Sequence, residues 1–398
     1  MSTFLPRTWA EINIDSISHN YHTIKNLLKP EVQMMAVVKA DAYGHGVQYI
    51  APELDKLGAD WFAVSNLEEA MQLRNLNIVK PILILGYTPP NMAKALSDYN
   101  ISQTVFDLSY AKALSSYAVE NNVTVKIHIK IDTGMGRLGF VYHKLNDTAC
   151  IDEIYTACTL DNLESEGIFT HFASSDLDGD ESGEFTKTQF KLFCTATDEL
   201  EQKGVSFKLR HCCNSAATLN NPEYQLDMVR PGIILYGMHP SAALKDRADL
   251  KPAMCLKSVV SMVKTLSSGD SISYGRTFTV NDNITVATVP VGYADGYPRS
   301  LSNKGYVMIN GKKANIVGRI CMDQMVVDVT DIDNVTASQE ILLFGTDDNG
   351  TLSVEDFSCL CGTINYETVC IVGKRVSRVF VKNGEKIGYL NYILNTHQ

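Results

Sequence analysis

The chain has 398 residues, of which 45% are hydrophobic and 20% are charged, and its formal net charge at pH 7 is −10. This composition is that of an ordinary globular protein, and it excludes a disordered or collagen-like chain. The negative charge argues against broad binding to nucleic acid or to an anionic membrane surface. No apolar run reaches the roughly 20 residues of a membrane-spanning helix, and the first residues lack the apolar core of a signal peptide. We therefore expect a cytoplasmic protein.

From about residue 34 the chain alternates between short apolar runs, rich in β-branched residues, and amphipathic stretches. Eight such runs are predicted strands: 34–38, 61–64, 81–85, 101–106, 124–131, 166–172, 207–212 and 225–229. Helices are expected between them, for example over 66–74 and 185–203. The residues that could start helices are Asn66, Asp107 or Ser109, and Ser182. Eight βα units predict an α/β fold with a (β/α)₈ TIM-type barrel over residues 15–243, and a doubly wound open sheet is the alternative.

Near residue 240 the pattern changes. A polar segment with two prolines, 239–252, is followed by strand-like runs without long helices between them: 254–266, 283–294, 306–318 and 324–330. The Asn310-Gly311 pair is a strong signal for a tight β-hairpin. We therefore predict a mostly β domain over 244–398. The alternating sequence TWAEINID belongs to an N-terminal segment, 1–14, that is expected to add a strand to this domain.

The stretch AVVKADAYGHG (36–46) places Lys39 at the end of the first predicted barrel strand. In a barrel, the carboxyl ends of the strands face the active site. Burial behind an apolar run lowers the pKa of a lysine and makes its amine a nucleophile, which could hold an aldehyde cofactor as a Schiff base. The alternative is a lysine that reaches from the strand end to solvent.

Three further stretches of the barrel carry candidate binding groups. Ser215 begins a short helix-prone segment and Gly232 allows close approach of the backbone, a combination that suits a phosphate after strands 7 and 8. Arg137 lies among three glycines after strand 5 and could clamp a carboxylate. His171 lies near the end of strand 6. Each has a plain alternative: a helix cap and turn, a surface loop, and a hydrogen-bonded packing histidine.

In the predicted β domain, Tyr274 and Tyr366 stand in dense Gly/Tyr/Arg clusters and could act as a phenol acid or base or as phosphate ligands. They could equally be core aromatics with a solvated hydroxyl. None of the 10 cysteines forms a C-x-x-C pair, so we expect reduced thiols that pack as small apolar groups, and no metal site.

Taken together and in order, these motifs resemble the alanine racemases, pyridoxal 5'-phosphate enzymes built from a (β/α)₈ barrel and a C-terminal β domain. The resemblance covers nearly the whole chain. It rests on AVVKADAYGHG together with KIDTGMGRLGF, HCCNSAA, VRPGIILYG, SYGRTF, GYADGYPR, GRICMDQ and INYE.

The resemblance implies a role for each matching position. Lys39 would hold the cofactor and act as one base, and Tyr274, hydrogen-bonded to His171, would be the second base on the opposite face of the substrate. Arg230 would bond the pyridine nitrogen. Arg137 and the backbone of Met322 would bind the substrate carboxylate, and Lys130 matches a lysine that is often carbamylated. The residues implied for the cofactor phosphate are Tyr43, Ser215, the backbone of Gly232 and Ile233, and Tyr366.

The resemblance also implies a reaction, a partner and a place in metabolism. Two bases would interconvert L-alanine and D-alanine, the latter as a precursor of peptidoglycan. The family forms homodimers in which the barrel of one chain and the β domain of the other complete each active site. Three alternatives stay open: a serine or broad-specificity racemase, an amino-acid decarboxylase, and a non-enzymatic carrier of the cofactor. A decarboxylase would need a carboxylate where this chain has Arg230, and a carrier lacks the β domain.

Overall fold

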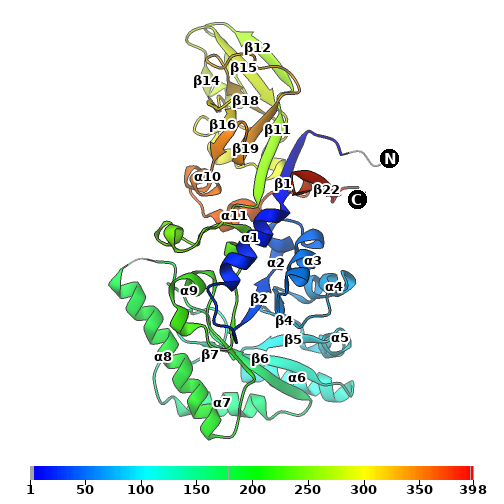
Figure 1. Cartoon of the computed structure of the whole chain (residues 1–398), viewed down its shortest axis with the longest axis vertical. Helices are drawn as coiled ribbons and strands as arrows, with labels where there is room; N and C mark the ends of the chain where they lie inside the picture. Colours follow the sequence, from blue (N-terminus) through cyan, green and yellow to red (C-terminus); the bar gives the residue numbers. More distant parts are fainter. Residues whose placement is uncertain (1–3, 178, 395, 398) are drawn as a thin grey trace. The chain divides into compact units, whose positions relative to one another are not determined.

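The computed structural model describes residues 4–177, 179–394 and 396–397. The chain forms two compact units, each of which is continuous in space but not in sequence (Figure 1). Residues 17–42 and 47–251 form the first, here called the barrel unit, and residues 1–16, 43–46 and 252–398 form the second, the β unit.

All eight predicted barrel strands are present in the described part of the barrel unit, and they are parallel to one another. They follow the order β10-β2-β3-β4-β5-β6-β8-β9, and the short strand β7 (Phe140–Val141) pairs with β6. The amide of Asp227 donates to the carbonyl of Arg210, which brings the two ends of the sheet together. The expected barrel is therefore confirmed in a nearly closed form, and the open-sheet alternative was wrong. The strands are β2 (Gln33–Val37), β3 (Trp61–Val64), β4 (Ile82–Ile84), β5 (Ile101–Val105), β6 (Val125–Asp132), β8 (Leu163–Phe169), β9 (Leu209–His211) and β10 (Met228–Val229).

Helices alternate with these strands, as the pattern predicts. They are α1 (Ile14–Lys25), α3 (Val47–Leu57), α4 (Leu67–Asn75), α5 (Ala93–Asp98), α6 (Leu108–Glu120), α7 (Thr148–Cys158), α8 (Asp180–Gln202) and α9 (Ser215–Asn220). Asn66 and Asp107 cap α4 and α6 as expected, because each side chain accepts from an amide of the first turn. Ser182 was the wrong start for α8. The helix already begins at Asp180, where two acidic residues favour its N-terminus, and the carbonyl of Ser182 accepts from Thr186 inside the helix.

The β unit is built on a long mixed sheet in the order β17-β16-β19-β11-β1-β21-β22-β23. The N-terminal strand β1 (Thr8–Asn13) pairs antiparallel with β11 and parallel with β21. Asn310 and Gly311, both with positive φ, form the predicted hairpin between β16 and β17. The other strands of this sheet are β11 (Met254–Val259), β16 (Tyr306–Ile309), β17 (Lys312–Asn315), β19 (Glu340–Asp347), β21 (Ser377–Lys382), β22 (Glu385–Asn391) and β23 (Thr396–His397).

Smaller elements of the β unit lie beside this sheet. They are a three-stranded sheet of β12 (Met262–Leu266), β15 (Ile284–Val289) and β18 (Met325–Asp328), a pair of β13 (Ser271–Ile272) and β14 (Phe278–Thr279), β20 (Gly350–Leu352), which pairs with β19, and the helices α10 (Val354–Cys361) and α11 (Asn365–Cys370). The mostly β character expected for this part of the chain is confirmed.

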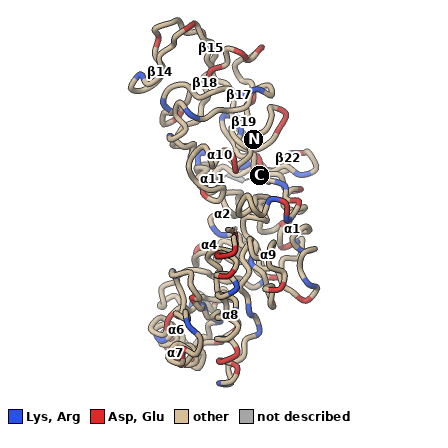
Figure 2. The backbone as a smooth tube through the Cα atoms, turned by 90° about the vertical axis from the view of Figure 1, so that its left-hand side faces the viewer, with Lys and Arg blue, Asp and Glu red and all other residues tan. Residues whose placement is uncertain are grey.

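Charged residues of both signs are interspersed along the backbone of both units (Figure 2). Within the described residues, no helix has the length and apolar character that crossing a membrane requires. All 10 cysteines are free thiols, so the structure contains no disulfide among them.

Candidate active site

Lys39 follows β2 at the carboxyl end of the barrel, and the backbone after it makes a left-handed turn. Ala40, Asp41 and Ala42 all have φ near +50° (52°, 55° and 54°), a conformation that costs free energy for residues with a Cβ. The turn is held from outside, because the amide of Ala40 donates to the carboxylate of Glu69, 2.8 Å away. Lys39 itself is half-buried. The backbone position of Lys39 is therefore fixed by the strand before it and by the strained turn after it.

Arg230 comes directly after β10 and is buried, with 4% of its surface exposed. Its guanidinium donates to the ring nitrogen Nδ1 of His211 at 2.9 Å, and to the carbonyls of Thr170 and Cys212 at 2.8 and 3.1 Å. Burial lowers its pKa to about 10, so the group stays protonated at neutral pH. Among the described residues, nothing accepts the Nε–H. Arg230 is thus a rigid cation whose Nε–H is left for a ligand.

His171 and Lys130 lie close to this cation. Nη2 of Arg230 is 3.4 Å from Nδ1 of His171. Burial, reinforced by the charges of Lys130 and Arg230, holds the pKa of His171 well below its usual range, so the imidazole is neutral. The smaller contributions to this shift include those of Arg137 and Lys39, which places both of these residues near the imidazole.

Lys130 is buried on β6, with 5% of its surface exposed, and its Nζ has no hydrogen-bond partner within the described residues. The nitrogen lies 4.8 Å from the centre of the Phe169 ring. Burial and the nearby cations Arg230 and Arg137 hold its pKa well below the usual range of a lysine. A lowered pKa favours the neutral, nucleophilic form of this amine.

The loop that carries Arg137 is organised by Asp132 at the end of β6. The carboxylate accepts the amides of Gly134 and Gly136 at 2.9 and 3.1 Å. Burial opposes ionisation of Asp132, but these hydrogen bonds outweigh it and lower the pKa of the carboxyl. Arg137 is exposed on this loop. The loop backbone that carries the guanidinium of Arg137 is therefore held in place by Asp132.

The predicted phosphate segments meet as the sequence suggested. The amide of Gly232 donates to the hydroxyl of Ser215 at 2.8 Å. Asn214 caps the short helix α9 by accepting the amide of Ala217 at 3.0 Å. Ile233 follows Gly232 and is fully buried. Ser215, Gly232 and Ile233 thus present hydroxyl and amide groups from two chain segments at one place.

In the β unit, Tyr43 and Tyr366 form a second cluster of predicted site residues. Their rings lie 6.3 Å apart, and burial, with the neighbouring phenol of Tyr366, raises the pKa of Tyr43. The approach depends on Gly44, where a Cβ would stand 2.3 Å from the carbonyl oxygen of Val369. No larger residue fits at Gly44. Two phenols therefore lie close together in the β unit.

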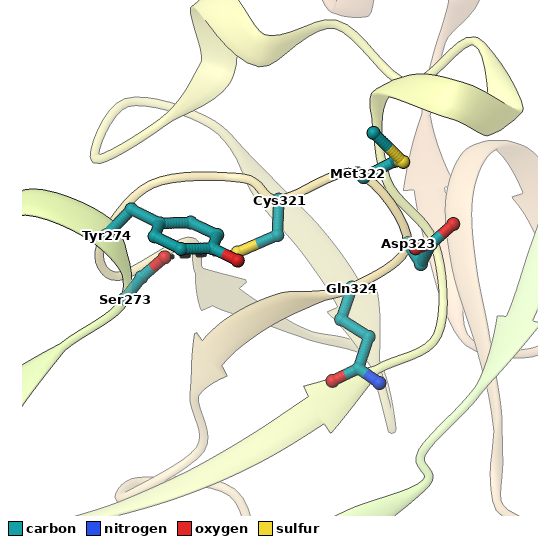
Figure 3. A pocket seen from close by; sticks show the side chains of 6 residues that line it. All are labelled: Ser273, Tyr274, Cys321, Met322, Asp323 and Gln324. Carbon is teal, nitrogen blue, oxygen red and sulfur yellow. Dashed lines mark hydrogen bonds between the residues drawn. The ribbon is translucent and has the colours of Figure 1, made fainter.

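Tyr274 and Met322 line one cavity of about 420 Å³ in the β unit (Figure 3). The other lining residues are Ser273, Cys321, Asp323 and Gln324. Tyr274 exposes 72% of its surface and Met322 exposes 52%. The backbone that carries Tyr274 is held by the hydroxyl of Ser273, which donates to the carbonyl of Arg319.

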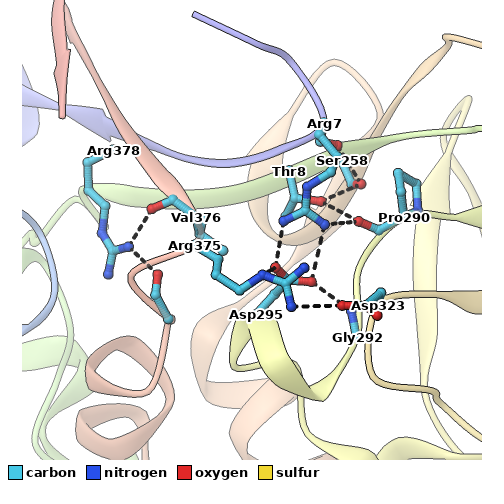
Figure 4. Close-up of polar contacts among 11 residues, drawn as sticks. Arg7, Thr8, Ser258, Pro290, Gly292, Asp295, Asp323, Arg375, Val376 and Arg378 are labelled. Carbon is cyan, nitrogen blue, oxygen red and sulfur yellow. Dashed lines mark hydrogen bonds and ion pairs between the residues drawn. The ribbon is translucent and has the colours of Figure 1, made fainter. Parts of the chain in front are cut away.

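A buried carboxylate, Asp295, lies between Arg7 and Arg375, and Arg375 also contacts Asp323 (Figure 4). It accepts from Arg7 on one side, and Arg375 lies 3.5 Å away on the other. Arg375 also donates to Asp323, at 2.7 Å, next to Met322. The carbonyl of Met322 accepts the amide of Ala294, and no described residue accepts the amide of Met322 itself. That N–H is therefore available to a ligand.

The structure thus groups the predicted residues into four sets. One is Lys39, Lys130, Arg137, His171 and Arg230, and the second is Ser215 with Gly232 and Ile233. The third is Tyr43 with Tyr366, and the fourth is Tyr274 with Met322. Sequence reasoning assigned no role to His211, which directly contacts Arg230, or to Asp295 and Arg375. His211 opens the motif HCCNSAA, which was the only signal for it.

Comparison with known proteins decides the family. Models of the N-terminal and C-terminal domains of alanine racemase match residues 12–240 and 253–380. The alanine racemase of Clostridium tetani is 45% identical over 395 residues, which covers 99% of this chain and 100% of that protein. The chain belongs to the alanine racemase family. An alanine racemase 1 of Clostridium acetobutylicum is 44% identical, over 97% of this chain and 98% of that protein.

Solved structures of alanine racemases share the whole fold. The enzyme of Clostridium difficile 630 is 39% identical with a TM-score of 0.91, over 98% of this chain and 100% of that one. The Bacillus anthracis alanine racemase with bound L-Ala-P is 33% identical with a TM-score of 0.92, over 99% and 100%. The expected enzyme class, an amino-acid racemase and hence an isomerase, is confirmed. Among the described residues, no group of three or more His, Cys, Asp or Glu is placed to hold a metal ion.

Proposed function

We propose that this alanine racemase interconverts L-alanine and D-alanine with pyridoxal 5'-phosphate as cofactor and with Lys39 and Tyr274 as two opposed bases. The observation that carries the proposal is Arg230: a buried guanidinium, held by three acceptors, with its Nε–H left for a ligand atom. A pyridine nitrogen fits that donor. Lys39, half-buried after β2 and near His171, is the amine for the aldehyde.

The donor set suits the rest of this cofactor. Ser215, whose hydroxyl accepts the Gly232 amide and keeps its own proton to donate, suits a phosphate together with the amide of Ile233 and the phenols of Tyr43 and Tyr366. When bound, the cofactor acidifies the Cα–H of an amino acid by accepting electron density into its ring. The protein then has to move one proton at Cα, and racemisation needs a base on each face, because a single base returns the proton to the side it left.

Lys39 and Tyr274 fill these two roles, and the other residues of the site position the substrate. Arg137 and the free N–H of Met322 bind the substrate carboxylate, which leaves the Cα–H between the two bases. His171 is neutral and accepts from Arg230, so it orients the phenol of Tyr274 rather than acting as an acid. Arg230 cannot hand a proton to the ring, which keeps the cofactor a weak electron sink and disfavours transamination.

Lys130 fits a carbamate. Its amine is buried beside the cations Arg230 and Arg137, which lower its pKa, and it has no hydrogen-bond partner within the described residues. Addition of the amine to carbon dioxide forms an N–C bond and releases one proton, and the resulting anion pairs with Arg137. Protein prepared with ¹³C-bicarbonate should show one carbamate carbon signal, and Lys130→Met should lose it. A signal that survives Lys130→Met would place the carbamate elsewhere.

We further propose that the enzyme is a cytoplasmic homodimer with shared active sites, and that its D-alanine supplies peptidoglycan synthesis. Tyr274 and Met322 are exposed on the β unit, which is the arrangement expected of residues that complete a site on a second chain. The substrate is a small amino acid, and a serine hydroxyl in place of a hydrogen is weakly discriminated by an apolar pocket.

Borohydride reduction of the purified protein tests the proposal. Reduction should attach the cofactor to the peptide that contains Lys39, and Lys39→Ala should abolish both the attachment and the racemisation of L-alanine. The matched control is Lys94→Ala, which removes a surface lysine paired only with Asp98 on its own helix. Attachment at any other lysine would overturn the assignment.

A further inference from the structure

A file of buried polar side chains runs through the barrel unit behind Arg230, and the proposed reaction does not use it. His211 on β9 accepts from Arg230 at its Nδ1, and its Nε2 lies 2.9 Å from Nδ1 of His128 on β6. Nε2 of His128 lies 3.4 Å from the carboxylate of Glu166 on β8. Glu166 also accepts the hydroxyl of Ser102 on β5, at 2.7 Å.

The packing around this file shows that it is built into the barrel. Both histidines are fully buried, and the ring of His211 stacks on Phe169 with centres 4.8 Å apart and planes at 6°. The ring of His128 lies where a side chain at Gly167 would be, since a Cβ there would stand 2.4 Å from Nδ1. Space for the imidazole therefore depends on a glycine on the neighbouring strand.

The donor and acceptor properties of these groups give the hydrogen bonds of the file one direction. A guanidinium only donates, so Nδ1 of His211 has no proton, and the neutral ring carries its proton on Nε2. That N–H donates to Nδ1 of His128, which leaves the proton of His128 on Nε2, facing Glu166. An ionised carboxylate only accepts. Burial disfavours the carboxylate, but the neighbouring imidazole of His128 and the hydrogen bond from Ser102 outweigh burial and lower the pKa of Glu166. Every donor in the file therefore points from Arg230 towards Glu166.

We infer that Glu166, acting through His128, is a positioning residue that stabilises the tautomer of His211 that Arg230 requires, and so keeps an acceptor aimed at Arg230. This inference rests on the proposed role of Arg230 as partner of the cofactor ring. Without the carboxylate, the buried N–H of His128 loses the anion that it faces at 3.4 Å. The other tautomer of His128 puts a proton on Nδ1, which faces the N–H of His211. A matching change in His211 would turn an N–H towards the guanidinium. Arg230 would then lose one of its three strong acceptors.

Nitrogen NMR of the purified full-length chain, labelled with ¹⁵N-histidine, tests the inference in the wild-type protein, and substitutions serve only to assign the signals. Both His128 and His211 should be neutral, with the proton on Nε2 and bare Nδ1. Their signals are assigned by their loss in His128→Asn and His211→Asn. A proton on Nδ1 of either ring would overturn the inference. Because this measurement needs neither cofactor nor substrate, it stays decisive if the borohydride experiment fails at Lys39.

Substitution then tests the link to catalysis. Glu166→Met, which keeps the size and removes the acceptor, should redistribute the tautomers and lower kcat/KM roughly 10- to 100-fold, the effect of one misdirected buried hydrogen bond. Glu166→Gln, whose amide oxygen still accepts, should restore the wild-type tautomers and most of the activity. Glu164→Met is the matched control, since Glu164 lies on the same strand in a surface pair with Lys208. Glu166→Met with wild-type tautomers and the kcat/KM of the control would refute the positioning role.

Discussion

The barrel unit and the β unit present their site residues in opposite ways. Arg230 exposes 4% of its surface and is held by three acceptors, whereas Tyr274 exposes 72% and Met322 exposes 52%. The site residues of the barrel unit are held in place by contacts within that unit. These contacts include the histidine tautomers inferred behind Arg230. In the β unit the backbone near the site is held by hydrogen bonds, but the side chain of Tyr274 is exposed to solvent. A side chain this exposed needs another surface to cover it before it can be positioned at a substrate atom.

The comparison predicts that Tyr274→Phe has the largest effect. Loss of one base should lower racemisation by roughly 10²- to 10⁴-fold, the usual contribution of a positioned acid or base. Exchange of the Cα hydrogen with solvent deuterium should continue for one enantiomer only, because Lys39 still serves one face. Tyr293→Phe is the control, since Tyr293 is an exposed tyrosine of the same unit. Exchange that continues equally for both enantiomers would show that Tyr274 is not the second base.

Arg230→Glu should have the next largest effect, and it changes the kind of reaction. A carboxylate allows the ring nitrogen to hold a proton, so transamination to pyruvate should rise, and racemisation should fall about 10²-fold, as for loss of one aligned charge. The change also leaves the carbonyls of Thr170 and Cys212 without a donor, so thermal unfolding should be followed in parallel. Arg230→Lys, which keeps the charge, is the control. An unchanged product ratio in a folded Arg230→Glu protein would refute the role.

Arg375→Ala tests the site residues of the β unit at a position away from the two bases, and it should have the smallest effect. The side chain joins Asp295 to Asp323 and so steadies the loop of Met322, but it is more than a third exposed. We expect KM for alanine to rise about threefold with kcat nearly unchanged, because a partly solvated ion pair contributes little. Steady-state kinetics decide this. A fall in kcat with constant KM would mean that the loop acts on the bases rather than on carboxylate binding.

Sequence reasoning found the parts of the site that local pattern determines. The position of Lys39 follows from an apolar run that ends in a charge, and the meeting of Ser215 with Gly232 follows from barrel topology. The left-handed turn from Ala40 to Tyr43 was not predicted, since alanine rarely adopts positive φ and the acceptor Glu69, which holds the amide of Ala40, is distant in sequence.

The partners behind the site were also beyond the sequence. His128 and Glu166 lie on strands that read as ordinary alternating segments, and their contact appears only when the barrel brings β6 and β8 together. Asp295 and Arg375 are separated by 80 positions of sequence and meet through tertiary packing. These groups contribute through contacts that form only in the folded protein, and a local residue pattern does not predict such contacts.

Subunit exchange between two inactive proteins tests most directly whether the exposed half of the site serves a second chain. Lys39→Ala and Tyr274→Phe are each expected to be inactive. Random exchange should give about half heterodimers, each with one site that keeps both bases, and so roughly a quarter of wild-type activity. Recovery near that level is the predicted result. No recovery, with heterodimers demonstrated by mass spectrometry of the intact dimer, would contradict the shared site and mean that each chain supplies both of its own bases.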